Sequence, residues 1–335
     1  MRRLRRAYAA LVAFAGEREP AEGLALFRIA VGLVMLYALL SMVVPGLDHL
    51  LWIDAADGGM QRLRGDHWLL ELLGGPTGAV MGALIPTGIL LAVLVAAGAG
   101  GRVTLLLAGQ VYAAIVRANP TIIGGYDHLL TNALWLLFLG GATASLSVDA
   151  RLRRGAWRPA DATVAAWPRR LAVFQLLVVY TTTGINKLGV PWTPIGGFSA
   201  LYWVYQEPTW RRFDMSWTAD PLPYVLLQIA AAVTWIWEIG AIILLLFFYF
   251  RATPERPGRL RALAQRFDLR AGFIAVGVVL HVGILLTLNV GPFSWISLAY
   301  YLCFFRPEEL VSAVRRLRRR PVTGAPDGDE RAPRA

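Results

Sequence analysis

The sequence predicts an all-α polytopic membrane protein, a bundle of about eight transmembrane helices with both termini in the cytoplasm. The 335-residue chain is 56% hydrophobic, with a mean hydropathy of +0.52, which is too apolar for a soluble domain of this length. Its apolar residues come in long blocks, as transmembrane helices require. Most of its arginines lie between these blocks, so the net charge of +11 indicates membrane topology and no nucleic-acid partner.

The apolar blocks predict the positions of the spans. They cover residues 24–44, 77–97, 103–118, 124–145, 171–187, 224–250, 271–290 and 293–305. Pro86 predicts a kink in the second span, and Asn119-Pro120 ends the third. Arg28 lies one turn inside the first span, close enough to its end for the guanidinium to snorkel to the interface.

The segments outside the spans predict three regions. Residues 1–20 form a cytoplasmic amphipathic segment at the interface, residues 21–311 form the transmembrane domain, and residues 312–335 form a basic, partly disordered cytoplasmic tail. With eight spans, the basic loops 149–170 and 251–270 lie on the same side as both termini, and the acidic connection 46–75 lies on the other. The positive-inside rule makes the basic side cytoplasmic, as expected for a multi-pass protein of a bacterial-type plasma membrane.

Polar side chains within the apolar blocks are costly and suggest function. His128 and Lys187 fall at the extracytoplasmic ends of two consecutive spans, and Glu238 and His281 fall near the midplane. Each has a structural alternative: Lys187 can snorkel beside Trp192, and Glu238 and His281 can hydrogen-bond neighbouring helices. Together they predict one polar cavity open to the extracytoplasmic side. Its predicted lining is Asn186, Glu238, His281, Asn132 and Thr183.

Such a cavity suits proton abstraction. A lysine buried there can be a neutral amine and act as a general base, and His128 can stabilise an oxyanion. We expect Glu238 to hydrogen-bond a polar group on another helix, with His281 the leading candidate, and we expect no structural ion pair at Lys187. Asp127 is better explained as a helix N-terminal cap. Cys303 is the only cysteine and the four histidines are scattered, so we expect no disulfide and no conventional metal site.

Several short motifs resemble the HTTM family, the membrane domain shared by bacterial proteins and vitamin K-dependent gamma-carboxylase. The resemblance extends from about residue 24 to 311. Its carriers are Leu26-Phe-Arg-Ile-Ala-Val-Gly32, Asn119-Pro120 with Gly125-Tyr-Asp-His-Leu129, Gly184-Ile-Asn-Lys-Leu188 with Trp192, Trp237-Glu238, and Leu280-His281 with Gly291-Pro-Phe-Ser294.

The resemblance implies roles for two residues. Lys187 matches the carboxylase lysine regarded as the base that deprotonates reduced vitamin K, and His128 matches the histidine thought to assist at the oxyanion stage. The implied cofactor is a reduced quinone. Asn186 stands where the carboxylase has the first of two adjacent lysines, so quinone or other lipid-phase chemistry is expected in preference to peptide carboxylation.

The sequence leaves open whether the protein is an enzyme. One alternative is a non-enzymatic maturation or immunity component that acts with an exported peptide. Another is a small-molecule transporter, which is typically marked by paired discontinuous helices. Gly291-Pro292 is one candidate break, and the sequence shows no partner for it.

Overall fold

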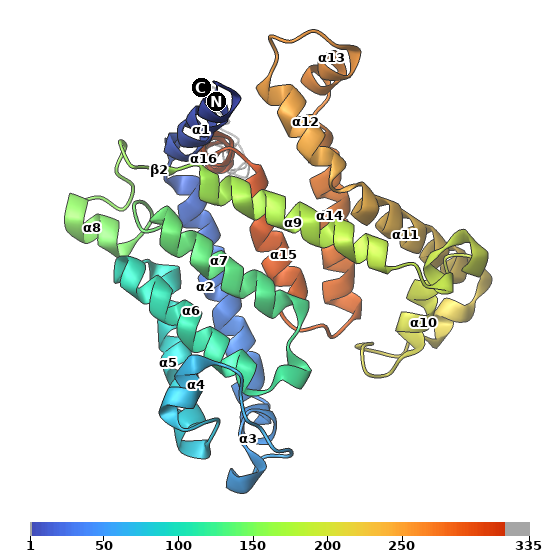
Figure 1. The fold of residues 1–335 in the computed structure, drawn as a ribbon. Coiled ribbons are helices and arrows are strands. Elements are labelled where there is room, and N and C mark those ends of the chain that lie inside the picture. Colours follow the sequence, from blue (N-terminus) through green and yellow to red (C-terminus); the bar gives the residue numbers. More distant parts are fainter. Residues whose placement is uncertain (1, 319–335) are drawn as a thin grey trace, which may run out of the picture.

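The computed structural model describes residues 2–318, which form a predominantly helical bundle (Figure 1). The elements are α1 (Arg2–Gly16), β1 (Arg18–Pro20), α2 (Glu22–Val43), α3 (Leu47–Leu51), α4 (Trp68–Leu73), α5 (Gly78–Ala97), α6 (Gly101–Ala118), α7 (Gly125–Gly140), α8 (Val148–Arg154), β2 (Thr163–Ala165), α9 (Trp167–Asn186), α10 (Ala200–Gln206), α11 (Pro221–Gly240), α12 (Ile243–Ala252), α13 (Arg259–Arg266), α14 (Leu269–Thr287), α15 (Phe293–Tyr301) and α16 (Pro307–Arg318). Short 3₁₀ turns include η3 (Val190–Trp192) and η6 (Leu302–Phe304).

Four helices in the described part of the chain, α2, α5, α11 and α14, are long and apolar enough to cross a membrane. They coincide with the first, second, sixth and seventh predicted spans. The other predicted spans form α6, α7, α9 and α15, of which α15 is short. The all-helical membrane class is therefore confirmed, whereas the count of eight spans and the cytoplasmic placement of the termini remain predictions.

Helix α2 is the central element of the first half of the bundle. Its buried face repeats at helical spacing through Leu24, Phe27, Val31, Met35 and Leu39, as an amphipathic packing face does. It packs against α5, α7 and α15. A Cβ at Gly32 would lie 2.5 Å from the backbone nitrogen of Ala96, so the absence of a side chain lets α2 and α5 approach closely.

Arg28 does not snorkel to the interface, and that prediction is wrong. Its side chain is fully buried and donates hydrogen bonds to the carbonyl oxygens of Val95, Ala96, Ala142 and Leu146. The carbonyls of Val95 and Ala96 belong to the C-terminal end of α5, and those of Ala142 and Leu146 belong to the turn that follows α7. Carbonyl groups at the end of a helix and in a turn commonly need such acceptor contacts outside the helix. The guanidinium thus joins two helix ends to α2.

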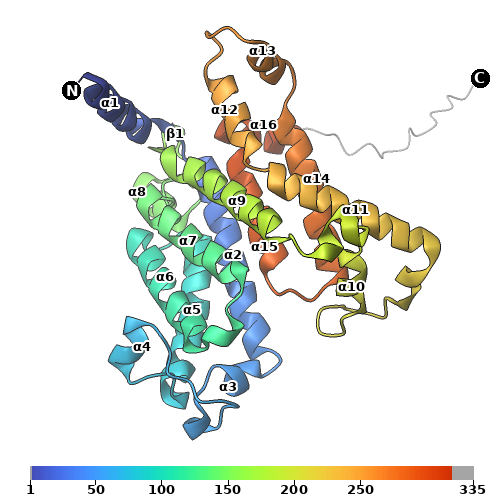
Figure 2. The same cartoon turned by 45° about the vertical axis from the view of Figure 1, so that its right-hand side comes forward.

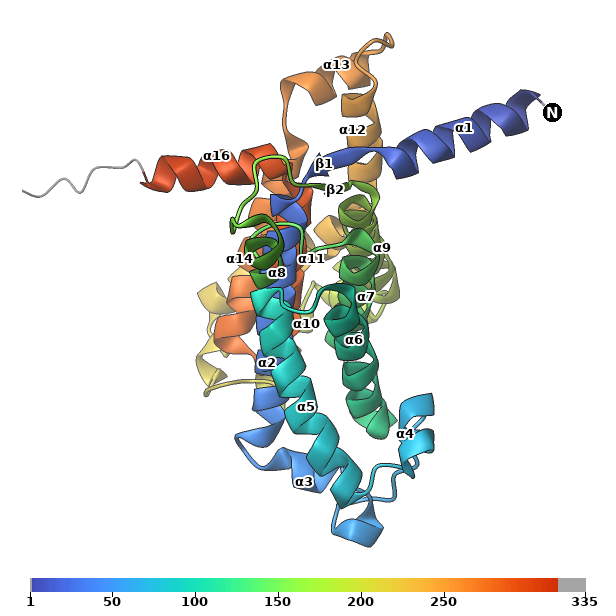
Figure 3. The same ribbon diagram turned by 90° about the vertical axis from the view of Figure 1, so that its left-hand side faces the viewer.

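The basic segments gather at one end of the bundle. Helices α1, α13 and α16 lie at this end, and α3, α4 and α10 lie at the other (Figures 1 and 3). Helices α1 and α16 project sideways from the bundle (Figure 3). The antiparallel pair β1–β2 joins the end of α1 to the segment before α9. Of the predicted tail, residues 312–318 form the end of α16, and residues 319–335 lie outside the described residues.

The sixth predicted span is not continuous. Helix α11 ends at Gly240 and α12 begins at Ile243. The backbone nitrogen of Ile242 donates to the Thr181 hydroxyl of α9, at 3.1 Å. A side chain from a neighbouring helix therefore satisfies a backbone group where the helix is interrupted, as a break inside a membrane requires.

Asp127 caps α7 as predicted. Its Oδ2 accepts a hydrogen bond from the backbone nitrogen of Gly124 at 2.8 Å, and its Oδ1 accepts one from the Tyr112 hydroxyl of α6 at 2.6 Å. The carboxylate therefore fixes both the start of α7 and its position against α6.

Candidate functional site

Helix α9 packs between α7 and α11 (Figures 1 and 2). Near its C-terminal end, a Cβ on Gly184 would lie 2.8 Å from the backbone nitrogen of Ile239 and 2.9 Å from Cβ of Glu238. The missing side chain therefore allows α9 and α11 to meet closely at this level. The close approach brings the end of α9 to the buried carboxylate of Glu238.

Lys187 forms an ion pair with Glu238. It is the residue that directly follows α9, and its Nζ lies 2.6 Å from each carboxylate oxygen of Glu238. The two side chains are 22% and 7% exposed, respectively. The Nζ also lies 4.6 Å from the centre of the Trp192 ring in η3, within cation–π range. The lysine charge is thus compensated from one side and covered by an aromatic ring.

His281 lies in a second polar cluster. Its Nε2 is 2.7 Å from the hydroxyl of Tyr180 on α9, which is 2.9 Å from the hydroxyl of Tyr301 on α15. His281 is fully buried. A Cβ on Gly277, one turn before His281, would lie 2.0 Å from the Tyr301 hydroxyl oxygen, so this phenol occupies space that only a glycine leaves free.

Aromatic side chains connect the two clusters. The rings of Tyr180 and Trp237, the residue preceding Glu238, have centroids 4.6 Å apart. Trp237 stacks on Phe273 of α14, also at 4.6 Å, and its indole nitrogen donates to the Phe273 carbonyl. The ion pair and the His281 cluster are therefore parts of one packed region formed by α9, α11, α14 and α15.

Several buried polar atoms of this region lack partners among the described residues, among them Trp235 Nε1 on α11 and Ser297 Oγ on α15. Two others are Nδ1 of His281 and the hydroxyl oxygen of Ser294, at the start of α15. Buried polar groups are normally hydrogen-bonded, and an unpartnered one in a native fold calls for an explanation such as a bound ligand or water. Both atoms belong to the His281 and Gly291–Ser294 motifs.

The structure separates the predicted site residues into two groups. Lys187, Glu238 and His281 lie in the region just described, whereas His128, Asn132, Thr183 and Asn186 are exposed. His128 and Lys187 share no hydrogen bond or ion pair within residues 2–318, although α7 and α9 are neighbours as expected. Their convergence on one cavity therefore stays a prediction.

Two expectations about these residues are corrected. His281 is not the partner of Glu238, because Lys187 engages both carboxylate oxygens and His281 faces Tyr180. Lys187 was also expected to be replaceable without loss of a structural ion pair, which is wrong for the same reason. The sequence pattern missed Tyr180 and Tyr301, because tyrosines in apolar helices are ordinary packing residues unless their hydroxyls meet.

Lys187 is the only lysine in the chain, and the other 32 of its 33 basic residues are arginine. Arginine is the usual choice for a bidentate pair with a carboxylate, and its guanidinium stays protonated. Lysine differs from arginine here in that an amine has a neutral form, whereas a guanidinium stays protonated.

The apolar spans with polar clusters in the interior define the chain as an all-helical integral membrane protein. The HTTM domain family model matches residues 17–308. The chain belongs to the HTTM family, which confirms the resemblance seen in its motifs. No curated protein and no solved structure matches the chain.

Proposed function

We propose that this HTTM protein binds a reduced quinone, or another lipophilic compound with an acidic hydroxyl, and that Lys187 removes its proton. The observation that carries the proposal is the one lysine of the chain, paired at 2.6 Å with a buried glutamate at the end of a membrane helix. The neighbouring His281–Tyr180–Tyr301 cluster supplies further hydrogen-bonding groups in the same region.

The pair with Glu238 gives Lys187 a route to the neutral form. A proton can pass along either hydrogen bond from Nζ to a carboxylate oxygen, which leaves an amine beside a neutral carboxyl group. Both forms have no net charge, so the transfer leaves the net charge of the pair unchanged. The amine can then take the proton of a ligand O–H group: the O–H bond breaks, an N–H bond forms, and the resulting ammonium lies beside the oxyanion.

The residues present suit a ligand with two oxygens, because His281 Nδ1 and the Ser294 hydroxyl are buried without partners among the described residues. A reduced quinone would supply the acidic hydroxyl and the reducing equivalents. By resemblance, His128 would assist at the oxyanion, which requires a ligand that reaches the exposed face of α7.

Ionisation of a bound hydroquinone tests the proposal. The purified protein is mixed anaerobically with a reduced naphthoquinone, and the absorbance of the anion is recorded. We expect wild type to ionise the bound ligand and Lys187→Arg to bind it without ionising it, because guanidinium keeps its proton. Equal ionisation by Lys187→Arg would return Lys187 to a structural role. Mass spectrometry of co-purified lipids then identifies the native ligand.

Transport of a small molecule is a second candidate, favoured by one observation. The sixth predicted span is interrupted between α11 and α12, and discontinuous helices are typical of transporter binding sites. Proteoliposomes loaded with the hydroquinone distinguish the two functions. If the intact ligand crosses the bilayer and still does so in Lys187→Arg, transport is favoured. If the ligand does not cross the bilayer, the proton-abstraction proposal is left.

A further inference from the structure

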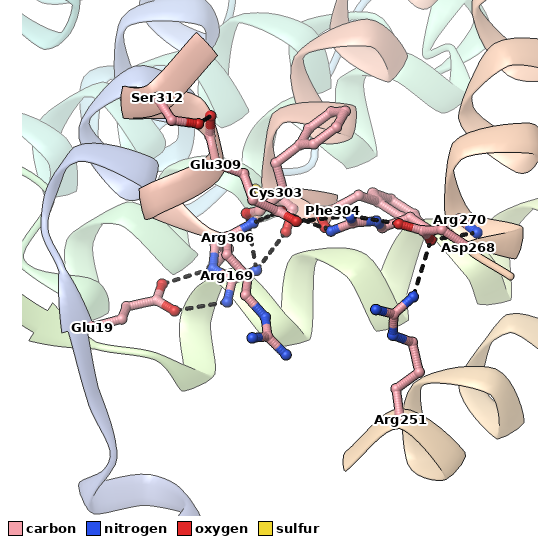
Figure 4. Close-up of polar contacts among 11 residues, drawn as sticks. Glu19, Arg169, Arg251, Asp268, Arg270, Cys303, Phe304, Arg306, Glu309 and Ser312 are labelled. Carbon is pink, nitrogen blue, oxygen red and sulfur yellow. Dashed lines mark hydrogen bonds and ion pairs between the residues drawn. The ribbon is translucent and has the colours of Figure 1, made fainter. Parts of the chain in front are cut away.

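A second hollow lies at the basic end of the bundle, away from Lys187. It encloses about 710 Å³, a typical volume for a small-ligand pocket. Its walls are the start of α9, the end of α12, the start of α14, the segment from Cys303 to Glu309, and the end of α1. Figure 4 shows the polar contacts among the residues on one side of it.

Five arginines line this pocket, against three carboxylates. The arginines are Arg169, Arg170, Arg251, Arg270 and Arg306, and the carboxylates are Glu17, Asp268 and Glu309. A fourth carboxylate, Glu19, lies behind the wall and binds Arg169 through both oxygens at 2.7 Å. The residues that line the pocket are therefore net positive, with five arginines against three carboxylates.

Three of the arginines are fixed by carboxylates and carbonyls. Arg169 holds Glu19 and the Cys303 carbonyl oxygen (Figure 4). Arg170 binds both oxygens of Glu17. Arg270 holds Glu309 through two hydrogen bonds of 2.8 and 2.9 Å. These groups form a rigid, neutralised wall.

The other two arginines are not fully engaged. Arg251 lies 3.8 Å from Asp268, a carboxylate already held by Arg270 at 2.8 Å. The Arg306 side chain makes no hydrogen bond or ion pair within the described part of the chain and is exposed. Arg251 and Arg306 therefore keep donors free for an anion.

The remaining wall is apolar. It consists of Val173, Leu245, Phe247, Phe248 and Phe304. The adjoining surface of α12 continues outward through Leu246, which is 49% exposed, as a lipid-facing helix does. A ligand of this pocket thus meets guanidinium groups on one side and hydrocarbon on the other.

We infer that this pocket binds the headgroup of an anionic phospholipid, with the phosphate at Arg251 and Arg306 and the glycerol and first methylenes against the apolar wall. Basic pockets between transmembrane helices at the cytoplasmic face are a recurrent form of lipid recognition. The positive-inside rule places this arginine-rich end at that face. The inference does not depend on the function proposed for Lys187, because the two regions share no residue.

Native mass spectrometry in mild detergent tests the inference. Phosphatidylglycerol and phosphatidylcholine are titrated separately, and retained lipid is counted. We expect one phosphatidylglycerol to bind in preference to phosphatidylcholine. Arg251→Ala with Arg306→Ala should weaken this binding about twenty-fivefold, at roughly fivefold for each arginine near the surface. Arg306→Ala alone should weaken it about fivefold, and this variant removes no contact that stabilises the fold.

The control is Arg259→Ala with Arg266→Ala, which removes the same charge from α13 without touching the pocket. We expect it to bind phosphatidylglycerol like wild type. Equal weakening by both pairs would show a diffuse basic surface and overturn the inference. An excess of inorganic phosphate should not displace the lipid, and displacement would identify a free-anion site instead. Equal retention of both lipids by wild type would also overturn it.

Discussion

Nζ of Lys187 lies 2.6 Å from both carboxylate oxygens of Glu238, and this contact joins the end of α9 to the buried face of α11. The contact changes what a substitution at Lys187 is expected to do. Removing the amine leaves a carboxylate that is 7% exposed without a partner, so chemistry and folding are both affected. Variants of the two partners separate these effects.

Lys187→Met should lower the free energy of unfolding by about 3–5 kcal/mol, because breaking a buried pair strands the other charge. Lys187→Met combined with Glu238→Leu should recover most of that loss while remaining inactive. Thermal melting in detergent of wild type, Lys187→Met and the double variant measures these differences in stability. If Lys187→Met melts like wild type, the ion pair contributes nothing to folding.

Arg28→Met should be among the most damaging single changes in the membrane domain. It leaves the carbonyl oxygens of Val95, Ala96, Ala142 and Leu146 without their donor, and each buried unsatisfied group costs about 1–3 kcal/mol. We expect little folded protein by size-exclusion chromatography. Arg62→Met, at an exposed arginine, is the matched control and should elute as wild type.

Tyr112→Phe should destabilise the contact between α6 and α7 by about 1–3 kcal/mol. The change removes the hydroxyl that donates to Asp127 at 2.6 Å and leaves a buried carboxylate oxygen short of a partner. The melting temperature should fall clearly. Tyr37→Phe is the control, because Tyr37 is 41% exposed and should tolerate the change. Equal melting temperatures of the two variants would contradict the role of Asp127 in holding α7 against α6.

Acid should loosen the helices at the basic end. The hydrogen bonds from Arg170 and Arg270 lower the pKa values of Glu17 and Glu309, respectively, below 4.5. A carboxyl group whose pKa is lower in the folded state than in the unfolded state stabilises the fold at any pH above its unfolded-state pKa. This stabilisation is lost as the pH falls through the folded-state pKa. Hydrogen exchange in α16, corrected for the intrinsic rate, should therefore stay level down to about pH 5 and rise below about pH 4. In Glu309→Gln, hydrogen exchange in α16 should be faster than in wild type at neutral pH, and its corrected rate should change less between neutral and acidic pH.

Single cysteines in a Cys303→Ser background test the orientation. Met60, Ile195 and Leu152 are 70%, 88% and 77% exposed, so each is accessible to a thiol reagent. In intact cells, an impermeant reagent should label cysteines at positions 60 and 195 but not at 152, because the positive-inside rule places the α8 loop in the cytoplasm. Labelling at 152 alone would reverse the topology.

Patterns local in the chain were readable from the sequence. Apolar blocks predicted α2, α5, α11 and α14, because helix length and hydropathy follow from consecutive residues. Asp127 was recognisable as a cap, because a cap and the amide it binds lie three residues apart. The family was also readable, since its motifs are short segments such as Gly184–Leu188.

Contacts between helices were decided only by the tertiary structure. Hydropathy does not fix how helices rotate against each other, so the sequence made His281, and not Lys187, the leading candidate partner for Glu238. The close approach at Gly184 selects Lys187. The sequence places Arg28 at the interface, whereas in the structure carbonyl groups from the end of α5 and from the turn after α7 surround its guanidinium. The basic pocket likewise exists only where segments more than a hundred residues apart meet, such as Arg169 and Cys303.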